Sequence, residues 1–232
     1  NQAIAIARLG GSVRIIGKTG TDSPGENRLK DLHNAGVDVS GVNADDSAPS
    51  GIALILVADS GENMIALAPG SNATLTPADI TANWQPGSKA CMAVLEVPVD
   101  AIEAAFRIAR SESVETILNA APPTKLSDYT LSLADHLIAN ETEAESLCGI
   151  AVQDQDTAFE AANAIRQLVR HSAIVTMGKH GAVLYGNTKL HIKAFKVKAV
   201  DTTAAGDAFC GAFALARSRG DDLETALRQA SG

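Results

Sequence analysis

The sequence predicts an α/β fold, namely a doubly wound, mostly parallel β-sheet with an additional β-hairpin. Short apolar runs typical of strands alternate with segments in which apolar residues recur at helical spacing, which indicates a parallel sheet with helices on both faces. Near residue 60, by contrast, two apolar runs flank a polar loop, which is typical of a hairpin. We expect a single domain over residues 1–232.

Each predicted element follows from a local pattern. Helices are predicted where apolar residues recur at helical spacing, at residues 25–35, 99–110, 157–170, 209–216 and 221–230. Strands are predicted at short runs rich in aliphatic residues, at residues 13–16, 90–95, 116–119, 136–139, 173–177 and 195–200. In the last of these strands, Phe195, Val197 and Ala199 alternate with lysines, so we expect it to have one buried face.

A separate hairpin is predicted over about residues 49–70. The runs IALILVA and MIALA flank the turn-rich segment Asp59-Ser60-Gly61-Glu62-Asn63, and this arrangement predicts a hairpin. In a single subunit, the hairpin would expose apolar side chains and an unpaired strand edge. We therefore expect a homodimer that forms through this hairpin.

Composition excludes several classes of protein. A chain of 232 residues with 46% hydrophobic and 20% charged residues can bury the core of one α/β domain. A formal charge of −8 argues against nonspecific binding to nucleic acid or to an anionic membrane. No apolar run reaches the roughly 20 residues of a membrane-spanning helix, and the first residues lack a secretory pattern. Three widely spaced cysteines favour free thiols, and we expect a cytoplasmic protein.

The segment from Asp201 to Phe209 combines features of a phosphate site. Ala204, Ala205 and Gly206 have almost no side chain, so backbone N–H groups at the start of the following helix could approach an anion. Asp207 stands among the first helical residues, where its carboxylate could take a proton from an attacking hydroxyl. From spacing alone, an equally good alternative is that a threonine or Asp207 simply caps the helix.

The same segment resembles a known family. The run DTTAAGDAFCGAFA is similar to the carboxy-terminal signature of the PfkB, or ribokinase, family of carbohydrate kinases. Asn1, Ala3, Gly10 and Gly20 resemble the end of the amino-terminal glycine-rich signature of that family. Three further similar segments begin at residues 50, 95 and 138, so the resemblance covers essentially the whole chain. It implies a ribokinase-like domain that is incomplete at both ends, in which the hairpin at about residues 49–70 belongs to a small β-sheet lid over the sugar.

The resemblance implies a function and a division of roles. The expected reaction is ATP-dependent phosphorylation of a sugar primary hydroxyl, with D-ribose as the first candidate. Asp207 would be the catalytic base, and the backbone around Ala204, Ala205 and Gly206 would stabilise the transferring phosphoryl group. Asn1 and Glu96 would contact the sugar together with Asp207. Without the family, Glu96 would be interpreted as an exposed charge at a strand end.

Further residues are assigned to the nucleotide and its ions. Asn140 and Glu143 would organise Mg²⁺ and its waters, although this pair also fits a helix capping box. The resemblance places Thr176, Gly178 and Gly181 along the ATP site, while a tight turn would also explain the glycines. Asp201 and Thr203 resemble positions that bind an activating monovalent cation, most simply K⁺.

Two other motifs do not carry function in this interpretation. Gly17-Lys18-Thr19 resembles the end of a P-loop, but Ser12 stands where the first glycine is required. The five histidines lack the spacing of metal ligands, so they are expected to be solvated or structural. Two alternative functions remain open. One is a PfkB-family kinase acting on deoxyribose, fructose or a nucleoside, and the other is a non-catalytic module that binds sugar or nucleotide.

Overall fold

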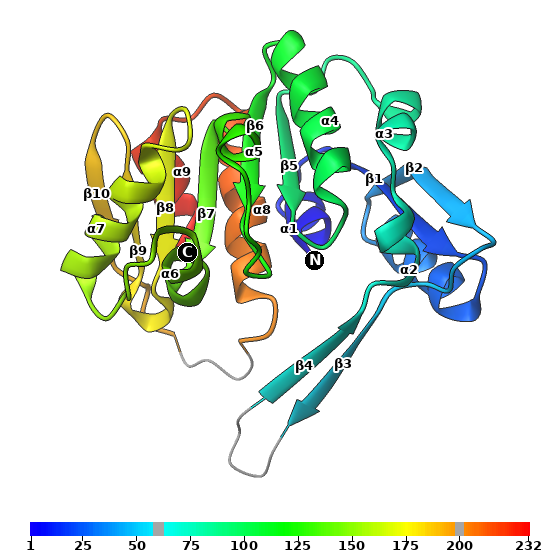
Figure 1. Ribbon diagram of the computed structural model, residues 1–232, viewed down its shortest axis with the longest axis horizontal. Helices are drawn as coiled ribbons and strands as arrows, with labels where there is room; N and C mark the ends of the chain where they lie inside the picture. Colours follow the sequence, from blue (N-terminus) through cyan, green and yellow to red (C-terminus); the bar gives the residue numbers. More distant parts are fainter. Residues whose placement is uncertain (58–62, 198–201) are drawn as a thin grey trace.

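The computed structural model describes residues 1–57, 63–197 and 202–232. Within these ranges the main sheet has the strand order β10-β9-β8-β7-β6-β5 (Figure 1). The strands β5 to β8 are parallel to one another, whereas β9 and β10 continue the sheet as an antiparallel hairpin. The strands of this sheet are β5 (Ala90–Val94), β6 (Glu115–Asn119), β7 (His136–Asn140), β8 (Ser172–Thr176), β9 (Ala182–Tyr185) and β10 (Lys189–Ile192).

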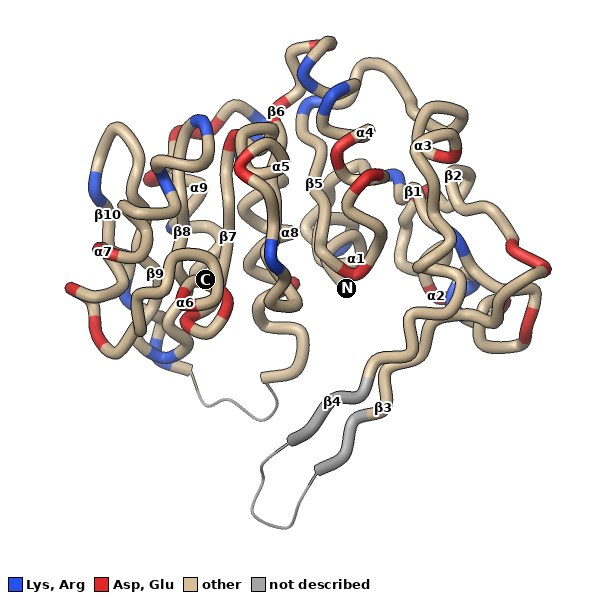
Figure 2. Tube along the Cα trace, viewed as in Figure 1, with Lys and Arg blue, Asp and Glu red and all other residues tan. Residues whose placement is uncertain are grey.

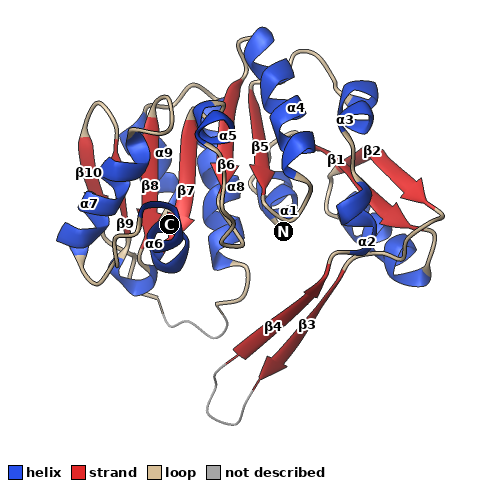
Figure 3. Ribbon diagram, viewed as in Figure 1, coloured by secondary structure: helices blue, strands red, loops and turns tan. Residues whose placement is uncertain are grey.

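Successive side chains of the central strands point to opposite faces of the sheet and pack into different hydrophobic clusters. In β6, Ile117 and Leu118 are both fully buried, but they belong to separate hydrophobic clusters. This follows from the alternation of side chains across a strand. One cluster includes residues of α4 (Val99–Ser111), α6 (Glu141–Cys148) and α7 (Gln155–Arg166). The other includes residues of α8 (Ala205–Ser218) and α9 (Leu223–Ala230), so helices cover both faces of the sheet, as predicted (Figure 3).

The remaining elements surround this sheet. Two further strands pair in parallel, and the predicted antiparallel hairpin extends from the body, while its role as a lid stays a prediction (Figure 1). Of the predicted hairpin loop, residues 59–62 lie outside the described residues, and Asn63 begins β4. These elements are α1 (Gln2–Arg8), β1 (Arg14–Gly20), α2 (Ser23–Asn34), β2 (Asp38–Asp45), β3 (Ile52–Val57), β4 (Asn63–Ala68), η1 (Gly70–Thr74), α3 (Pro77–Asn83), α5 (Asp128–Ser132) and η2 (Gly178–His180).

One predicted strand is wrong over its described part. Residues 195–197 form no strand, and residues 198–200 lie outside the described ranges. The side chain of Val197 is 78% exposed, so the alternating pattern marks no buried face. The last strand of the hairpin, β10, ends at Ile192, and in the described part of the chain residues 195–197 pair with no neighbouring strand. Alternation alone therefore misled the prediction, because a strand also needs a partner.

Other expectations concern the chain as a whole. Cys91, Cys148 and Cys210 are free thiols, as predicted. Among the described helices, none combines the length and the apolar character that crossing a membrane requires. Acidic and basic side chains are interspersed over the trace of the described residues (Figure 2).

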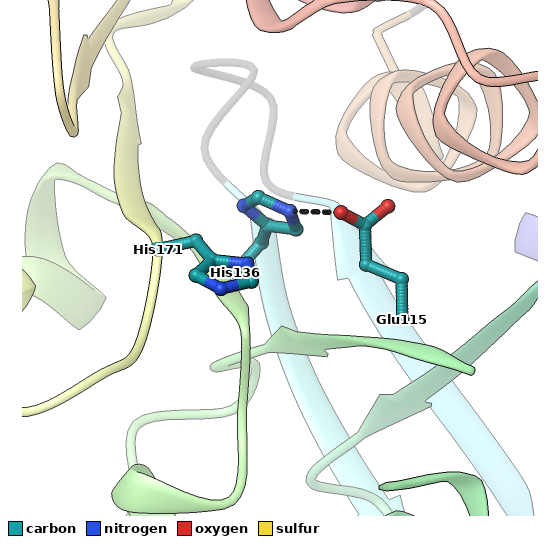
Figure 4. A group of neighbouring side chains, drawn as sticks. All are labelled: Glu115, His136 and His171. Atoms are coloured by element: carbon teal, nitrogen blue, oxygen red, sulfur yellow. Dashed lines mark hydrogen bonds and ion pairs between the residues drawn. The ribbon is translucent and has the colours of Figure 1, made fainter. Parts of the chain in front are cut away.

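A buried polar cluster links the strands at their amino-terminal ends. The imidazole of His136 lies between Ser172 Oγ, 2.7 Å from Nδ1, and Glu115 Oε1, 2.8 Å from Nε2 (Figure 4). Arg217 of α8 binds the same Glu115 carboxylate, with Nη2 2.7 Å from Oε1. The ligand atoms of Glu115, His136 and His171 all lie within 4.8 Å of one another, a proximity that the sequence did not predict. Because both nitrogens of His136 already have partners, the cluster joins β6, β7 and α8 as a hydrogen-bonded link, consistent with the prediction of structural histidines.

This cluster predicts a loss of stability in acid. Burial raises the pKa of Glu115, but the hydrogen bonds from His136 and Arg217 outweigh it and lower that pKa to about 2. A depressed carboxyl pKa stabilises the fold above the ordinary value of 4.5, and this contribution is lost as pH falls from there toward 2. Glu115→Gln should therefore unfold at lower urea concentration than wild type at pH 7, with a smaller difference at pH 3.5. Glu112→Gln, at an exposed position nearby, is the control. A difference that stays constant with pH would contradict the assignment.

Candidate active site

A pocket of about 260 Å³ lies where the parallel strands of the main sheet end. Residues at or just after the carboxyl ends of β5, β6, β7 and β8 form one side, and the first turn of α8 forms the other. Figure 1 shows α8 beginning at the end of the sheet toward which the arrows of β5 and β7 point. Ligand sites of open α/β sheets occur at this position, outside the carboxyl ends of the strands.

The start of α8 is shaped by small residues. Ala204 takes a left-handed conformation with φ +60° and is the N-cap of the helix, without a side-chain cap. The Ala205 N–H donates to the Thr202 carbonyl at 3.1 Å, and the Ala208 N–H donates to the Ala204 carbonyl at 2.9 Å. A Cβ added at Gly206 would have no heavy atom within 4 Å, so open space adjoins the backbone there. The structure thus has room for an anion beside the positive end of the helix dipole.

The Asp207 carboxylate faces the pocket and has two amide partners from α1. Asn1 Nδ2 donates to Oδ2 at 3.0 Å, and Gln2 Nε2 donates to Oδ1 at 3.0 Å. Asp207 therefore does not act as the N-cap of its own helix, which was the alternative interpretation. Each carboxylate oxygen instead accepts one amide hydrogen bond, which restricts the orientation of the Asp207 side chain.

Glu96 lies at the rim of this pocket, just after β5. Loss of hydration raises the pKa of the Glu96 carboxyl above its ordinary value, and the negative charge of Asp207 raises that pKa further. The structure therefore brings Glu96 within electrostatic reach of Asp207, which in turn contacts Asn1. These are the three residues that the sequence analysis assigned to the sugar.

Asn140 and Glu143 line the pocket and form the capping box of α6, so the capping interpretation is confirmed, while the magnesium role stays a prediction. The Glu143 carboxylate accepts from the Asn140 N–H at 2.8 Å and from Asn140 Nδ2 at 2.9 Å. Glu143 is 6% exposed, and burial raises the pKa of its carboxyl, although the Asn140 N–H opposes this effect. A buried carboxylate with neutral partners suits a hydrated Mg²⁺, which keeps several waters and needs few protein ligands. The residues present thus fit a magnesium ion.

The predicted nucleotide residues divide into two groups. Thr176 lines the pocket at the end of β8. Gly178 and Gly181 lie in the turn that follows and are not among the residues that line it. A Cβ at Gly181 would lie 2.0 Å from the Ile192 carbonyl oxygen, so a structural reason requires glycine there. Of the two predicted cation ligands, Asp201 lies outside the described residues, and Thr203 is exposed before α8.

Sequence reasoning missed three residues of the site. Gln2 bridges Asp207 and Asn119, with Nε2 2.9 Å from the Asn119 Oδ1. Asn119 ends β6. The rule that ligands bind outside the carboxyl ends of the strands of open α/β sheets could have identified this position. Cys210 follows Asp207 on the same face of α8 and lines the pocket, where burial raises the pKa of its thiol and the charges of Asp207 and Glu143 add to that effect. Such a thiol stays protonated and unreactive.

Comparison with known proteins agrees with this geometry. A sequence model of the pfkB family of carbohydrate kinases matches residues 1–232. The chain belongs to the PfkB family. The ribokinase of Staphylococcus aureus is 40% identical over 225 residues, which are 96% of this chain and 74% of the relative. The deoxyribokinase of Salmonella typhimurium is 33% identical over 234 residues, 99% of this chain and 76% of the relative.

Solved structures show the same PfkB-family fold. The ribokinase of Thermotoga maritima superposes with a TM-score of 0.85 at 31% identity, covering 99% of this chain and 76% of the relative. The ribokinase of Arabidopsis thaliana, solved with ribose and ATP, superposes with a TM-score of 0.89 at 24% identity, covering 99% and 77%. At that lower identity the likeness concerns the fold alone. The predicted family and α/β fold are therefore confirmed, and the protein is a ribokinase-like carbohydrate kinase.

Proposed function

We propose that this PfkB-family kinase transfers the γ-phosphoryl group of ATP to the primary hydroxyl of a pentose, with D-ribose as the preferred acceptor. One observation carries the proposal: the Asp207 carboxylate stands at the pocket wall, next to the open backbone at Gly206. A base and an anion site thus lie side by side at the start of one helix. The identity of 40% to a ribokinase supports ribose as the first acceptor to test.

The proposed mechanism uses the chain's own groups. Asp207 orients the sugar hydroxyl and receives its proton as the oxygen–phosphorus bond forms, while the bond to the β-phosphate oxygen breaks and ADP leaves. Glu96 and Asn1 hold other sugar hydroxyls near Asp207. The N–H groups at the start of α8 stabilise the negative charge of the transferring phosphoryl group. Closure of the β3–β4 lid excludes water, which would otherwise accept the phosphoryl group.

The remaining predicted residues serve the nucleotide. Thr176 contacts ATP at the end of β8, beside the turn that contains Gly178 and Gly181. Asn140 and Glu143 would hold Mg²⁺ through its waters, and the bound ion would neutralise part of the triphosphate charge. Thr203 and Asp201 would hold a monovalent cation, K⁺. Faster turnover in KCl than in choline chloride at equal ionic strength is the expected sign of that cation.

Gly206→Ala separates phosphate binding from folding. The added Cβ meets no protein atom within 4 Å, and alanine favours a helix over glycine by about 1 kcal/mol, so the variant should be at least as stable as wild type. The same methyl group would occupy the space proposed for the phosphoryl group, so we expect kcat/KM for ATP to fall about 10²-fold. Urea unfolding and steady-state kinetics measure the two effects. Unchanged kinetics in a stable variant would place the phosphoryl group elsewhere.

The function itself is tested with a panel of acceptors. The protein at its natural length is incubated with Mg·ATP and K⁺, and sugar phosphates are detected by mass spectrometry with D-ribose, 2-deoxyribose, fructose and adenosine as acceptors. The proposal expects the highest kcat/KM with ribose. A preference for deoxyribose would assign the chain to the activity of its Salmonella relative. Ribose and ATP binding without any product would instead favour the non-catalytic module.

The lid supports a proposed homodimer. Leu54 is 63% exposed in β3, and Leu67 is 51% exposed in β4. Leu67 pairs with Ala53, so the two leucines lie on opposite faces of the hairpin. A hairpin that is apolar on both faces can cover the sugar with one face and a partner's lid with the other. Leu67→Lys and Leu54→Lys, compared by sedimentation, should identify the face that holds the dimer together.

A further inference from the structure

Of the two amide groups on the Asp207 carboxylate, the proposed function leaves Gln2 without a role. We propose that Gln2 is a positioning residue for phosphoryl transfer: its carboxamide holds Oδ1 of Asp207 so that Oδ2 faces the sugar hydroxyl. This inference rests on the proposed function and deepens it. Gln2 does not touch the reacting atoms and acts through Asp207 alone.

The hydrogen bonds of Gln2 form a continuous link from the sheet to the base. Its Nε2 donates to Asp207 Oδ1 at 3.0 Å and to Asn119 Oδ1 at 2.9 Å, so both N–H bonds are directed at acceptors. Asn119 is buried at the end of β6, and its own Nδ2 donates to the Ile138 carbonyl of β7 at 3.3 Å. The rigid strand ends thereby fix the orientation of Gln2, and Gln2 fixes the carboxylate.

The packing of α1 on α8 brings Gln2 to this position. Gly211 follows Asp207 by one turn of α8, on the same face of that helix. A Cβ at Gly211 would lie 2.7 Å from the Gln2 carbonyl oxygen and 3.0 Å from the Ala5 Cβ. The two helices can therefore approach closely only because Gly211 lacks a side chain. This contact sets the distance between the backbone of Gln2 and Asp207.

The chemistry of an amide suits this role. A lysine or arginine at Gln2 would form an ion pair with Asp207 and weaken the carboxylate as a base, whereas a neutral amide holds it by hydrogen bonds alone. The two oxygens then differ in function. Asn1 donates to Oδ2 and is also a proposed sugar ligand. When the sugar binds, its hydroxyl replaces the Asn1 amide on Oδ2, whereas the Gln2 amide remains on Oδ1.

The test begins with Gln2→Met, which keeps the length of the side chain and removes both N–H donors. A carboxylate free to rotate is misplaced for proton transfer, so kcat should fall about 10- to 100-fold, with the KM values for sugar and ATP nearly unchanged. Gln2→Glu, which has the same shape, should also lower kcat because its carboxylate repels Asp207. The matched control is Gln229→Met, which removes an exposed glutamine–aspartate hydrogen bond on α9 and should leave kcat unchanged.

A double-mutant cycle with Asp207→Asn distinguishes positioning from a structural role. If Gln2 acts only through Asp207, Gln2→Met should not slow the residual turnover of the Asp207→Asn variant further. A slowdown of the same factor in both backgrounds would overturn the inference while leaving the proposed kinase function in place. A normal kcat in a folded Gln2→Met variant would also overturn the inference and leave the proposed kinase function in place. Absence of sugar phosphate from wild type with every acceptor would overturn the proposed function and this inference together.

Discussion

Asp207→Asn should lower kcat by about 10²- to 10⁴-fold, the range that general base catalysis contributes. Asparagine has nearly the same shape as aspartate, but its amide cannot take the proton of the sugar hydroxyl. The open backbone at Gly206 and the pocket residues Asn140, Glu143 and Thr176 are untouched, so ATP should bind with nearly the wild-type Kd. Stopped-time assays of sugar phosphate and calorimetric titration with a non-hydrolysable ATP analogue measure the two quantities.

The control for this substitution is Asp156→Asn. Asp156 also lies in the first turn of a helix, α7, but it is exposed and away from the pocket. It tests whether loss of a negative charge near any helix start slows the enzyme, and we expect full activity. Turnover of Asp207→Asn within a few-fold of wild type would remove Asp207 from the chemistry. The pocket would then need another proton acceptor, and Glu96 would be the first to examine.

Gly181→Ala should destabilise the fold by about 2 kcal/mol or more. Gly181 has φ +92°, and an added Cβ would lie 2.0 Å from the Ile192 carbonyl oxygen and 2.8 Å from the Ala194 nitrogen. Both neighbours are backbone atoms, which cannot move aside without disturbing the end of β10. The midpoint of urea unfolding should fall accordingly.

Gly178→Ala is the matched control in the same turn. Its φ is +51°, but a Cβ there meets no heavy atom within 4 Å, so only the left-handed conformation is unfavourable, at about 1 kcal/mol. Activity measured well below the unfolding transition then shows whether either glycine also serves ATP. Equal losses of stability in the two variants would contradict the structural explanation of Gly181.

Local patterns accounted for most of the secondary structure and for part of the site. The capping box of Asn140 and Glu143 was readable because its partners are three residues apart and face each other on any helix start. The parallel strands were readable because burial on both faces requires apolar runs. The order of small residues before Asp207 predicted an anion site, and the structure has open space there.

The same local reasoning failed where a long-range contact decides the outcome. Residues 195–197 alternate like a strand, but no strand of the described chain pairs with them. The helix α1 was not predicted, because residues 3–7 of QAIAIAR form an uninterrupted apolar run and therefore show no helical period. In the structure, this segment is helical and packs against Gly211 of α8.

The sequence by itself determined the family, the α/β class, and the residue types that a kinase needs near Asp207. Tertiary structure alone decided how these residues meet. Asn1 and Asp207 are 206 positions apart in the chain, and Gln2 and Asn119 are 117 apart, yet each pair is joined by a hydrogen bond. Patterns of period two or 3.6 describe only neighbours along one strand or helix. Contacts over such separations depend on how whole elements pack, which here rests on the close approach of α1 to Gly211.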